Sequence, residues 1–110
     1  MKVRVSRIGW LPLLGPSAAL AADAKQLFEA SKCVKCHSID SQGVAATPKA
    51  GDEAEVHDLS KVGAERTAEW IQNFLRKQAE LDGKKHKLKF RGSDADLETL
   101  ATWLASLGKQ

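Results

Sequence analysis

"CVKCH", residues 33–37, is the stretch that decides the fold of this chain. It holds the only two cysteines among 110 residues, and His37 follows the second of them directly. Two thiols one helical turn apart can add across the two vinyl groups on one edge of a porphyrin, and the adjacent imidazole can then bind the iron. The stretch therefore predicts one covalently attached haem c, with Cys33 and Cys36 as the attachment residues and His37 as the proximal iron ligand.

Other uses of a Cys-x-x-Cys pair account for fewer of these residues. A thioredoxin-like redox pair needs a βαβ context, which the sequence does not show. Half of a zinc site needs two further ligands, and the chain has no second cysteine pair. A structural disulfide gives His37 no role. A covalent cofactor uses all three side chains, and it also supplies apolar surface to a domain with a small core.

The N-terminal stretch "MKVRVSRIGWLPLLGPSAALA", residues 1–21, has the three-part pattern of a secretory signal. Early cations precede a short apolar run, and Ala19-Leu20-Ala21 has the small-x-small form of a cleavage site. We expect a signal peptide over residues 1–21, with Ala24 as an alternative edge, and one domain over residues 22–110 that works in the periplasm. The apolar run is far shorter than the ~20 residues of a membrane span, and no later stretch is apolar enough to span a bilayer.

The excess positive charge of the chain belongs to the same N-terminal segment. Lys2, Arg4 and Arg7 are 3 of the 17 basic residues, which leaves 14 against 14 acidic residues in the rest of the chain. The basic pI therefore gives no argument for nucleic-acid binding. Later cations gather in "GKKHKLKFRG", residues 83–92, where they surround His86.

Hydrophobic periodicity predicts three helices, over residues 24–33, 66–80 and 94–107. Thr67 is the expected N-cap of the second helix and Ser93 or Asp94 that of the third, which Gly108 is expected to end. No strand-like alternation is present, so we predict an all-α domain with long connections, including a loop over residues 83–92. The side chains expected to face the core are Leu27, Phe28, Ala30, Trp70, Ile71, Phe74, Leu75, Leu97, Leu100, Ala101, Leu104 and Leu107.

Three stretches resemble the class I cytochromes c. "AKQLFEASKCVKCH", residues 24–37, resembles the N-terminal helix and haem motif of that family, and "DLETLATWLASL", residues 96–107, resembles its C-terminal helix. "HDLSKVGAERTAEWIQNFL", residues 57–75, resembles the loop and middle helix beside the haem. The resemblance covers nearly all of residues 22–110. It implies a class I cytochrome c-like fold, with three main helices and long loops wrapped around one covalent haem.

The resemblance also implies roles for individual residues. Trp103 is expected to pack across the first helix near Ala24. The residue at His57 is often proline in the family, and its backbone carbonyl accepts the N–H of the proximal histidine. Any residue can offer this carbonyl, but a histidine leaves the loop less rigid than proline does, and the sequence does not decide whether the bond forms. The residues implied to pack against the haem face are Leu59, Trp70, Phe74 and Leu88.

The loop over residues 83–92 occupies the position from which the family supplies a methionine sulfur to the iron. The only methionine here is Met1, inside the expected signal peptide, so His/Met ligation is excluded by the count. We predict instead that His86 is the distal ligand, because neutral imidazole binds iron well. Two imidazoles favour a lower potential than one imidazole and a thioether. The alternatives are Leu88 covering a five-coordinate or water-bound iron, a deprotonated Lys85 or Lys87 as the ligand, and His57 reaching over the iron.

These residues favour a periplasmic single-electron carrier, expected to be a monomer and not an enzyme. The alternative is a five-coordinate haem protein that binds nitric oxide or carbon monoxide as a sensor or scavenger, which follows if Leu88 faces the iron. Peroxidase-like catalysis needs distal acid and base groups, for which only His86 and His57 are at hand. The loop cations either keep the loop hydrated or form a positive ring for an acidic redox partner. They are Lys84, Lys85, Lys87, Lys89 and Arg91.

Overall fold

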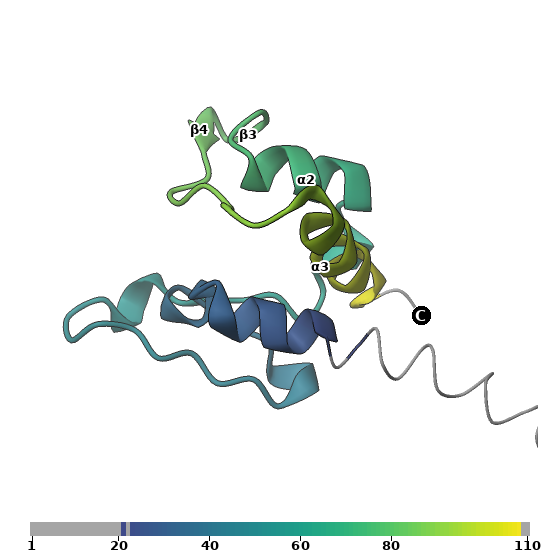
Figure 1. Ribbon diagram of the computed structural model, residues 1–110. Helices are drawn as coiled ribbons and strands as arrows, with labels where there is room; N and C mark the ends of the chain where they lie inside the picture. The colour runs from purple at the N-terminus through teal and green to yellow at the C-terminus, as the bar shows by residue number, and fades with distance from the viewer. Residues whose placement is uncertain (1–20, 22, 109–110) are drawn as a thin grey trace, which may run out of the picture.

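The computed structural model describes residue 21 and residues 23–108 of the chain (Figure 1). The predicted signal peptide, apart from Ala21, and its predicted cleavage site lie outside the described residues. Within the described part of the chain, no helix combines the length and the apolar character that crossing a bilayer requires.

Among the described residues, three α-helices form the frame, and four single-turn 3₁₀ helices lie in the connections between them. The N-terminal helix covers residues 23–30, α2 is Ala68–Leu75 and α3 is Asp94–Ser106. The 3₁₀ helices are η1 (Cys33–Lys35), η2 (Asp40–Gln42), η3 (Glu53–Glu55) and η4 (Val62–Ala64). This arrangement confirms the predicted mostly helical class with long connections.

The predicted caps of α2 and α3 are confirmed. The Thr67 hydroxyl accepts a hydrogen bond of 3.1 Å from the Trp70 N–H, and the Ser93 hydroxyl accepts one of 3.1 Å from the Asp96 N–H. Each cap satisfies a backbone donor that has no partner inside its helix. Gly108, with φ of 83°, follows the C-terminus of α3 in the left-handed conformation that glycine adopts without strain.

Two helices end earlier than their hydrophobic pattern predicts. The first ends at residue 30 rather than 33, because Lys32 adopts a left-handed φ of 64° and the chain turns into η1. α2 ends at Leu75 rather than residue 80, because Lys77 has a φ of 63° and its N–H bonds back to the Phe74 carbonyl. Ala30, predicted to face the core, is exposed because it lies in the last turn of the shortened helix, at the rim of the pocket facing α3.

Short β pairings replace part of the predicted loops. β1 (His37–Ser38) pairs in parallel with β2 (His57–Asp58), and β3 (Glu80–Leu81) pairs antiparallel with β4 (Lys84–Lys85). The predicted loop over residues 83–92 therefore begins with one arm of a hairpin. Strands of two residues are too short to show an alternating pattern, so hydrophobic periodicity could not predict them.

The core forms where α3 packs against α2 on one side and the N-terminal helix on the other (Figure 1). The rings of Phe28 and Trp103 meet edge to face with centroids 6.3 Å apart, and Ala24 is fully buried, which confirms the predicted crossing of the two terminal helices. The predicted inner face of α3 is confirmed as well. Its buried members are Leu97, Leu100, Ala101 and Leu104, with Leu107 just beyond the helix.

Candidate functional site

The two cysteines lie on a single 3₁₀ turn. η1 begins at Cys33, and the N–H of Cys36 donates to the Cys33 carbonyl over 3.1 Å. Both thiols are free and half-buried. Burial, together with the neighbouring Cys36, raises the pKa of Cys33 to about 11, so this sulfur is a protonated thiol at neutral pH. Redox-active cysteine pairs have a lowered pKa, so the environment of Cys33 disfavours a thioredoxin-like role.

His37 is fixed by the β1–β2 pairing. It stands opposite His57 in the parallel register, and the His57 N–H donates to the Cys36 carbonyl over 2.9 Å. The Nδ1 of His37 lies 3.3 Å from the His57 carbonyl oxygen. A carbonyl only accepts, so Nδ1 carries the proton and Nε2 keeps its lone pair for a metal. The bond that the sequence left open thus forms at residue 57 without a proline.

The pKa of His37 is lowered from its ordinary value. Partial burial is the main cause, because it disfavours the charged ring. The hydrogen bond to the His57 carbonyl opposes this shift, and the neighbouring His86 and His57 charges add to it. The lowered pKa keeps His37 neutral at neutral pH, which is the form that can bind iron.

His86 follows β4, and its ring lies near the ring of His37. The two ring centroids are 6.3 Å apart and the ring planes differ by 11°. The Nδ1–H of His86 donates to the Leu88 carbonyl, which leaves Nε2 of this ring with its lone pair too. The ring packs edge to face on Phe74 of α2, with centroids 5.2 Å apart. Both histidines are therefore oriented by a backbone carbonyl and share the same tautomer.

The separation of the two rings fits a pair of axial ligands. A metal–imidazole bond is about 2.0 Å and the ring centre lies about 1.1 Å beyond the nitrogen, so two imidazoles on one metal have centroids about 6.2 Å apart. The His37 and His86 rings, stacked with planes 11° apart, match this separation with centroids 6.3 Å apart. The His57 ring is equally distant at 6.2 Å, but it is tilted by 43°, and the backbone of His57 lies on the Nδ1 side of His37.

The histidine pair has two unprotonated Nε2 atoms that can bind a metal. In the described part of the chain, no group of three or more His, Cys, Asp or Glu side chains could hold a metal ion without further help. A porphyrin provides the four remaining in-plane nitrogens. The residues present therefore fit a haem attached at the cysteines beside His37.

The residues implied to pack on the haem face differ in how far they are buried. Leu59, Trp70 and Phe74 are half-buried, and the last two stack along α2 with ring centroids 4.7 Å apart. The Leu88 side chain is 54% exposed, and it is the backbone of this residue that contacts His86. Arg66, which was not predicted as a site residue, lies just before the Thr67 cap of α2, and its guanidinium is 4.2 Å from the Trp70 ring centre.

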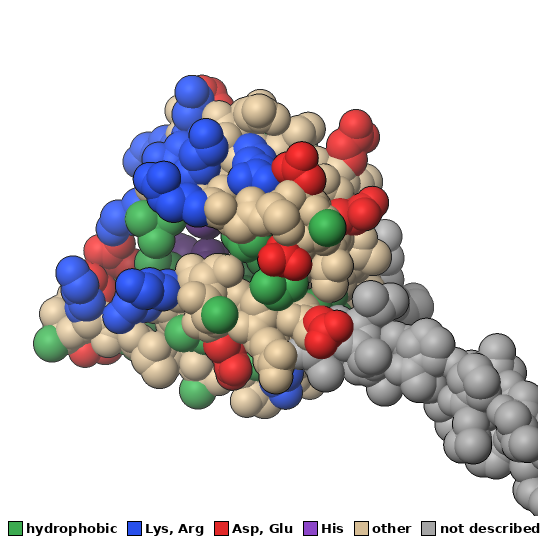
Figure 2. Space-filling view, in the orientation of Figure 1, with side chains coloured by type: hydrophobic (Ala, Val, Ile, Leu, Met, Phe, Trp, Pro, Cys, Tyr) green, Lys and Arg blue, Asp and Glu red, His purple; other side chains and the backbone are tan. Residues whose placement is uncertain are grey.

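The surface around the histidines is basic and apolar. Figure 2 shows histidine side chains at the bottom of a hollow in the surface. Hydrophobic side chains border the hollow, and a group of Lys and Arg side chains lies on one edge of it. The five predicted cations of the loop are all exposed.

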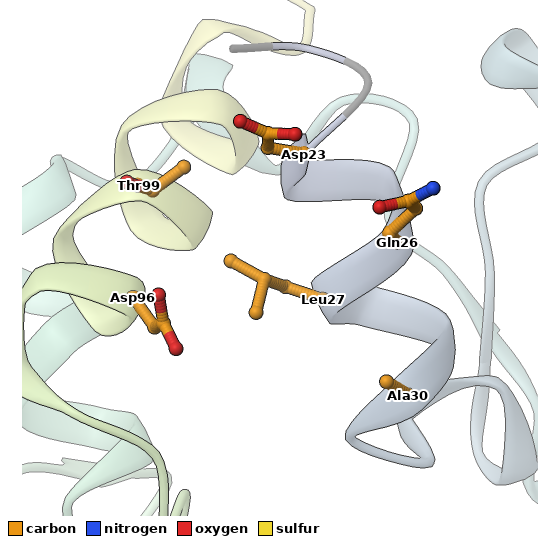
Figure 3. A pocket seen from close by; sticks show the side chains of 6 residues that line it. All are labelled: Asp23, Gln26, Leu27, Ala30, Asp96 and Thr99. Atoms are coloured by element: carbon orange, nitrogen blue, oxygen red, sulfur yellow. The ribbon is translucent and has the colours of Figure 1, made fainter. Parts of the chain in front are cut away.

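A separate pocket lies between the N-terminal helix and α3 (Figure 3). Its lining, which includes Asp23 and Asp96, contains neither histidine nor cysteine. The pocket is therefore distinct from the surroundings of His37 and His86.

One comparison with known proteins identifies a family. The family model described as Cytochrome c matches residues 21–108, which is most of the chain. Neither the curated proteins nor the solved structures compared with this chain include a match.

Proposed function

This chain belongs to the cytochrome c family, and on that basis we propose that it is a periplasmic single-electron carrier with His37 and His86 as the axial ligands of its haem iron. Members of the family bind haem c covalently and generally carry electrons, and Cys33 and Cys36 fit its attachment motif. When bound, haem c supplies the iron that takes up and releases one electron. The proposal adds the ligand pair, the compartment and a lowered potential.

The observation that carries the ligand assignment is the facing pair of imidazoles. The ring centroids of His37 and His86 are 6.3 Å apart, and each ring keeps an Nε2 that carries no proton. Their Nδ1 atoms are held by the carbonyls of His57 and Leu88. Hydrogen bonds of this kind fix the ring orientation and raise the basicity of the ligand. Rings that are already oriented need little movement when the charge of the site changes.

The potential follows from the ligand set. A thioether favours the ferrous state, and imidazole favours it less, so replacing methionine by His86 lowers the potential relative to His/Met relatives. The hydrogen bonds to Nδ1 act in the same direction, because a more basic imidazole stabilises the ferric charge.

The basic loop supports an acidic redox partner. The five cations of the loop that carries His86 are exposed, and Figure 2 shows a group of Lys and Arg side chains at one edge of the hollow that contains the histidines. Acidic residues, among them the run Asp52, Glu53 and Glu55, are grouped in a different stretch of the chain from these cations. Charges arranged in this way orient an encounter and speed it at low ionic strength. The periplasmic location rests on the N-terminal signal pattern.

The experiment is a comparison of coordination and potential on the holoprotein, produced in a host that matures c-type cytochromes. We expect low-spin spectra in both oxidation states, a potential below that of His/Met cytochromes c, and slow binding of carbon monoxide to the reduced protein. High-spin spectra with fast, tight carbon monoxide binding would instead assign the chain to gas binding. Cell fractionation tests the compartment: holoprotein in the periplasmic fraction, with the leader removed by mass, is the expected result.

A further inference from the structure

The segment that carries His86 leaves the end of α2 and returns to the start of α3. Its outgoing arm forms the β3–β4 hairpin, and its returning arm runs through Phe90 and Gly92 to the cap of α3. Every residue from 80 to 89 except His86 is exposed, so the segment buries little surface of its own. A compact loop of this kind keeps its shape only if its two ends are held together.

Arg76 joins the two ends. It is the first residue beyond α2, and its guanidinium donates 2.8 Å to the Phe90 carbonyl and 3.1 Å to the Gly92 carbonyl. The same group pairs with the Asp94 carboxylate at 2.8 Å, in the first turn of α3. One side chain thus binds residues 14, 16 and 18 positions further along the chain. The Arg76 side chain is 20% exposed; its bond to the Phe90 carbonyl is part-buried, whereas its bonds to Gly92 and Asp94 lie at the surface.

The returning arm is held most firmly at Phe90. Its N–H donates to the Leu75 carbonyl over 2.8 Å, its carbonyl accepts from Arg76, and its side chain is 7% exposed. The Arg76 guanidinium also lies 5.6 Å from the Phe90 ring centre. Both backbone groups of this residue are therefore tied to the end of α2.

His86 is separated from Phe90 by only a few residues along the chain. Leu88 stands two residues before Phe90, and its carbonyl accepts the Nδ1–H of His86. A shift of the returning arm therefore moves the group that orients the imidazole. The other support of the ring, Phe74, belongs to α2 and does not move with the arm.

We propose that Arg76 is a positioning residue that closes the segment over residues 76–92 and so sets how often His86 leaves the haem iron. This inference rests on the proposed ligation by His86. Small ligands reach the iron in proportion to the time that His86 is away, so closure by Arg76 limits their binding. Lysine cannot replace it, because one ammonium does not reach two carbonyls and a carboxylate in the geometry of the guanidinium fork.

The test compares Arg76→Met and Arg76→Lys with Arg91→Met, which removes the same charge from an exposed position of the same segment. Two readouts are needed on each holoprotein: amide hydrogen exchange of residues 84–92, and the rate of carbon monoxide binding to the reduced form. We expect Arg76→Met to raise both on the order of tenfold, with a smaller rise for Arg76→Lys and no change for Arg91→Met.

Each outcome decides the matter. Exchange that rises equally over the whole protein, or an Arg76→Met variant that behaves like Arg91→Met, would overturn the proposal. If Arg76→Met does not yield folded protein, unchanged readouts in Arg76→Lys overturn it. Faster exchange without faster carbon monoxide binding also overturns it, and the spectrum of His86→Ala then tells whether His86 is a ligand at all. The exchange readout reports closure of the segment even if the ligand assignment fails.

Discussion

Replacing His86 by alanine tests the ligand assignment most directly. The variant removes the ring that faces His37 at 6.3 Å and leaves every proximal contact in place. His57→Ala is a matched control, because its ring lies at nearly the same distance, 6.2 Å, while its backbone carbonyl, the partner of His37, is kept. We expect His86→Ala to convert the low-spin spectrum to high-spin and His57→Ala to leave it low-spin.

The size of the effect follows from the contacts that orient His86. The edge-to-face contact with Phe74, centroids 5.2 Å apart, contributes about 1 kcal/mol. The hydrogen bond to the Leu88 carbonyl contributes about 1 kcal/mol more. Together they favour the aimed ring roughly 30-fold over other orientations before any bond to iron forms. Carbon monoxide must compete with the oriented His86 ring for the iron. His86→Ala should therefore raise the affinity of the reduced protein for carbon monoxide by roughly 30-fold or more.

The assay is titration of reduced holoprotein with carbon monoxide, read beside the optical and spin-resonance spectra of the oxidised form. His57→Ala should change the affinity less than about twofold. A low-spin spectrum retained by His86→Ala would put another group at the sixth position. Equal effects of the two substitutions would refute the reasoning, because the tilt of 43° would then not distinguish the His57 ring from the His86 ring.

Three other predictions concern the frame, the pH dependence and the basic loop. In Gly63→Ala the new Cβ would lie 2.0 Å from a backbone carbonyl oxygen of α3, so we expect a loss of about 3 kcal/mol and a melting temperature lower by more than about 10 °C. Gly43→Ala, with φ of 71° and open space around its Cβ, should cost about 1 kcal/mol. In the chain without haem the folded pKa of His37 is lowered, so the unfolded chain binds more protons below the ordinary 6.5; denaturant midpoints of the haem-free chain should be constant above that pH and fall below it. Lys85→Glu with Lys87→Glu should slow electron exchange with a carboxylate-coated electrode and reverse its salt dependence, whereas an unchanged rate would assign these cations to hydration alone.

The parts of the fold that depend on local chemistry could be predicted from the sequence. The caps at Thr67 and Ser93 and the buried stripe of α3 follow from side chains a few residues apart, and the spacing of the cysteines carries the chemistry of attachment. The end of α2 could not be predicted, because the left-handed residue there is Lys77, and lysine does not usually adopt that conformation.

The features that depend on contacts between residues far apart in the sequence could not be predicted from hydrophobic periodicity. The hydrogen bond from His37 to residue 57 forms because β1 and β2 pair across 20 residues, and no local signal marks strands of two residues. The packing of the Leu88 side chain on the haem face stays a prediction, whereas the bond between the Leu88 carbonyl and His86 was not predicted. Backbone groups are the same in every residue, so a role carried by a carbonyl leaves no trace in the residue type.

Each of the two histidines is oriented by a hydrogen bond from Nδ1 to a backbone carbonyl, but the two carbonyls belong to different kinds of segment. His37 is held by a carbonyl that the β1–β2 pairing brings from 20 residues away, so its orientation is part of the tertiary fold. His86 is held by a carbonyl two residues further along its own exposed loop, so its orientation depends on that loop staying closed. Local segments with little buried surface open at a lower free energy than the core does. If His37 and His86 are the ligands as proposed, the proximal side can therefore persist while the distal side opens, and a single protein can combine a permanent attachment with an adjustable sixth position.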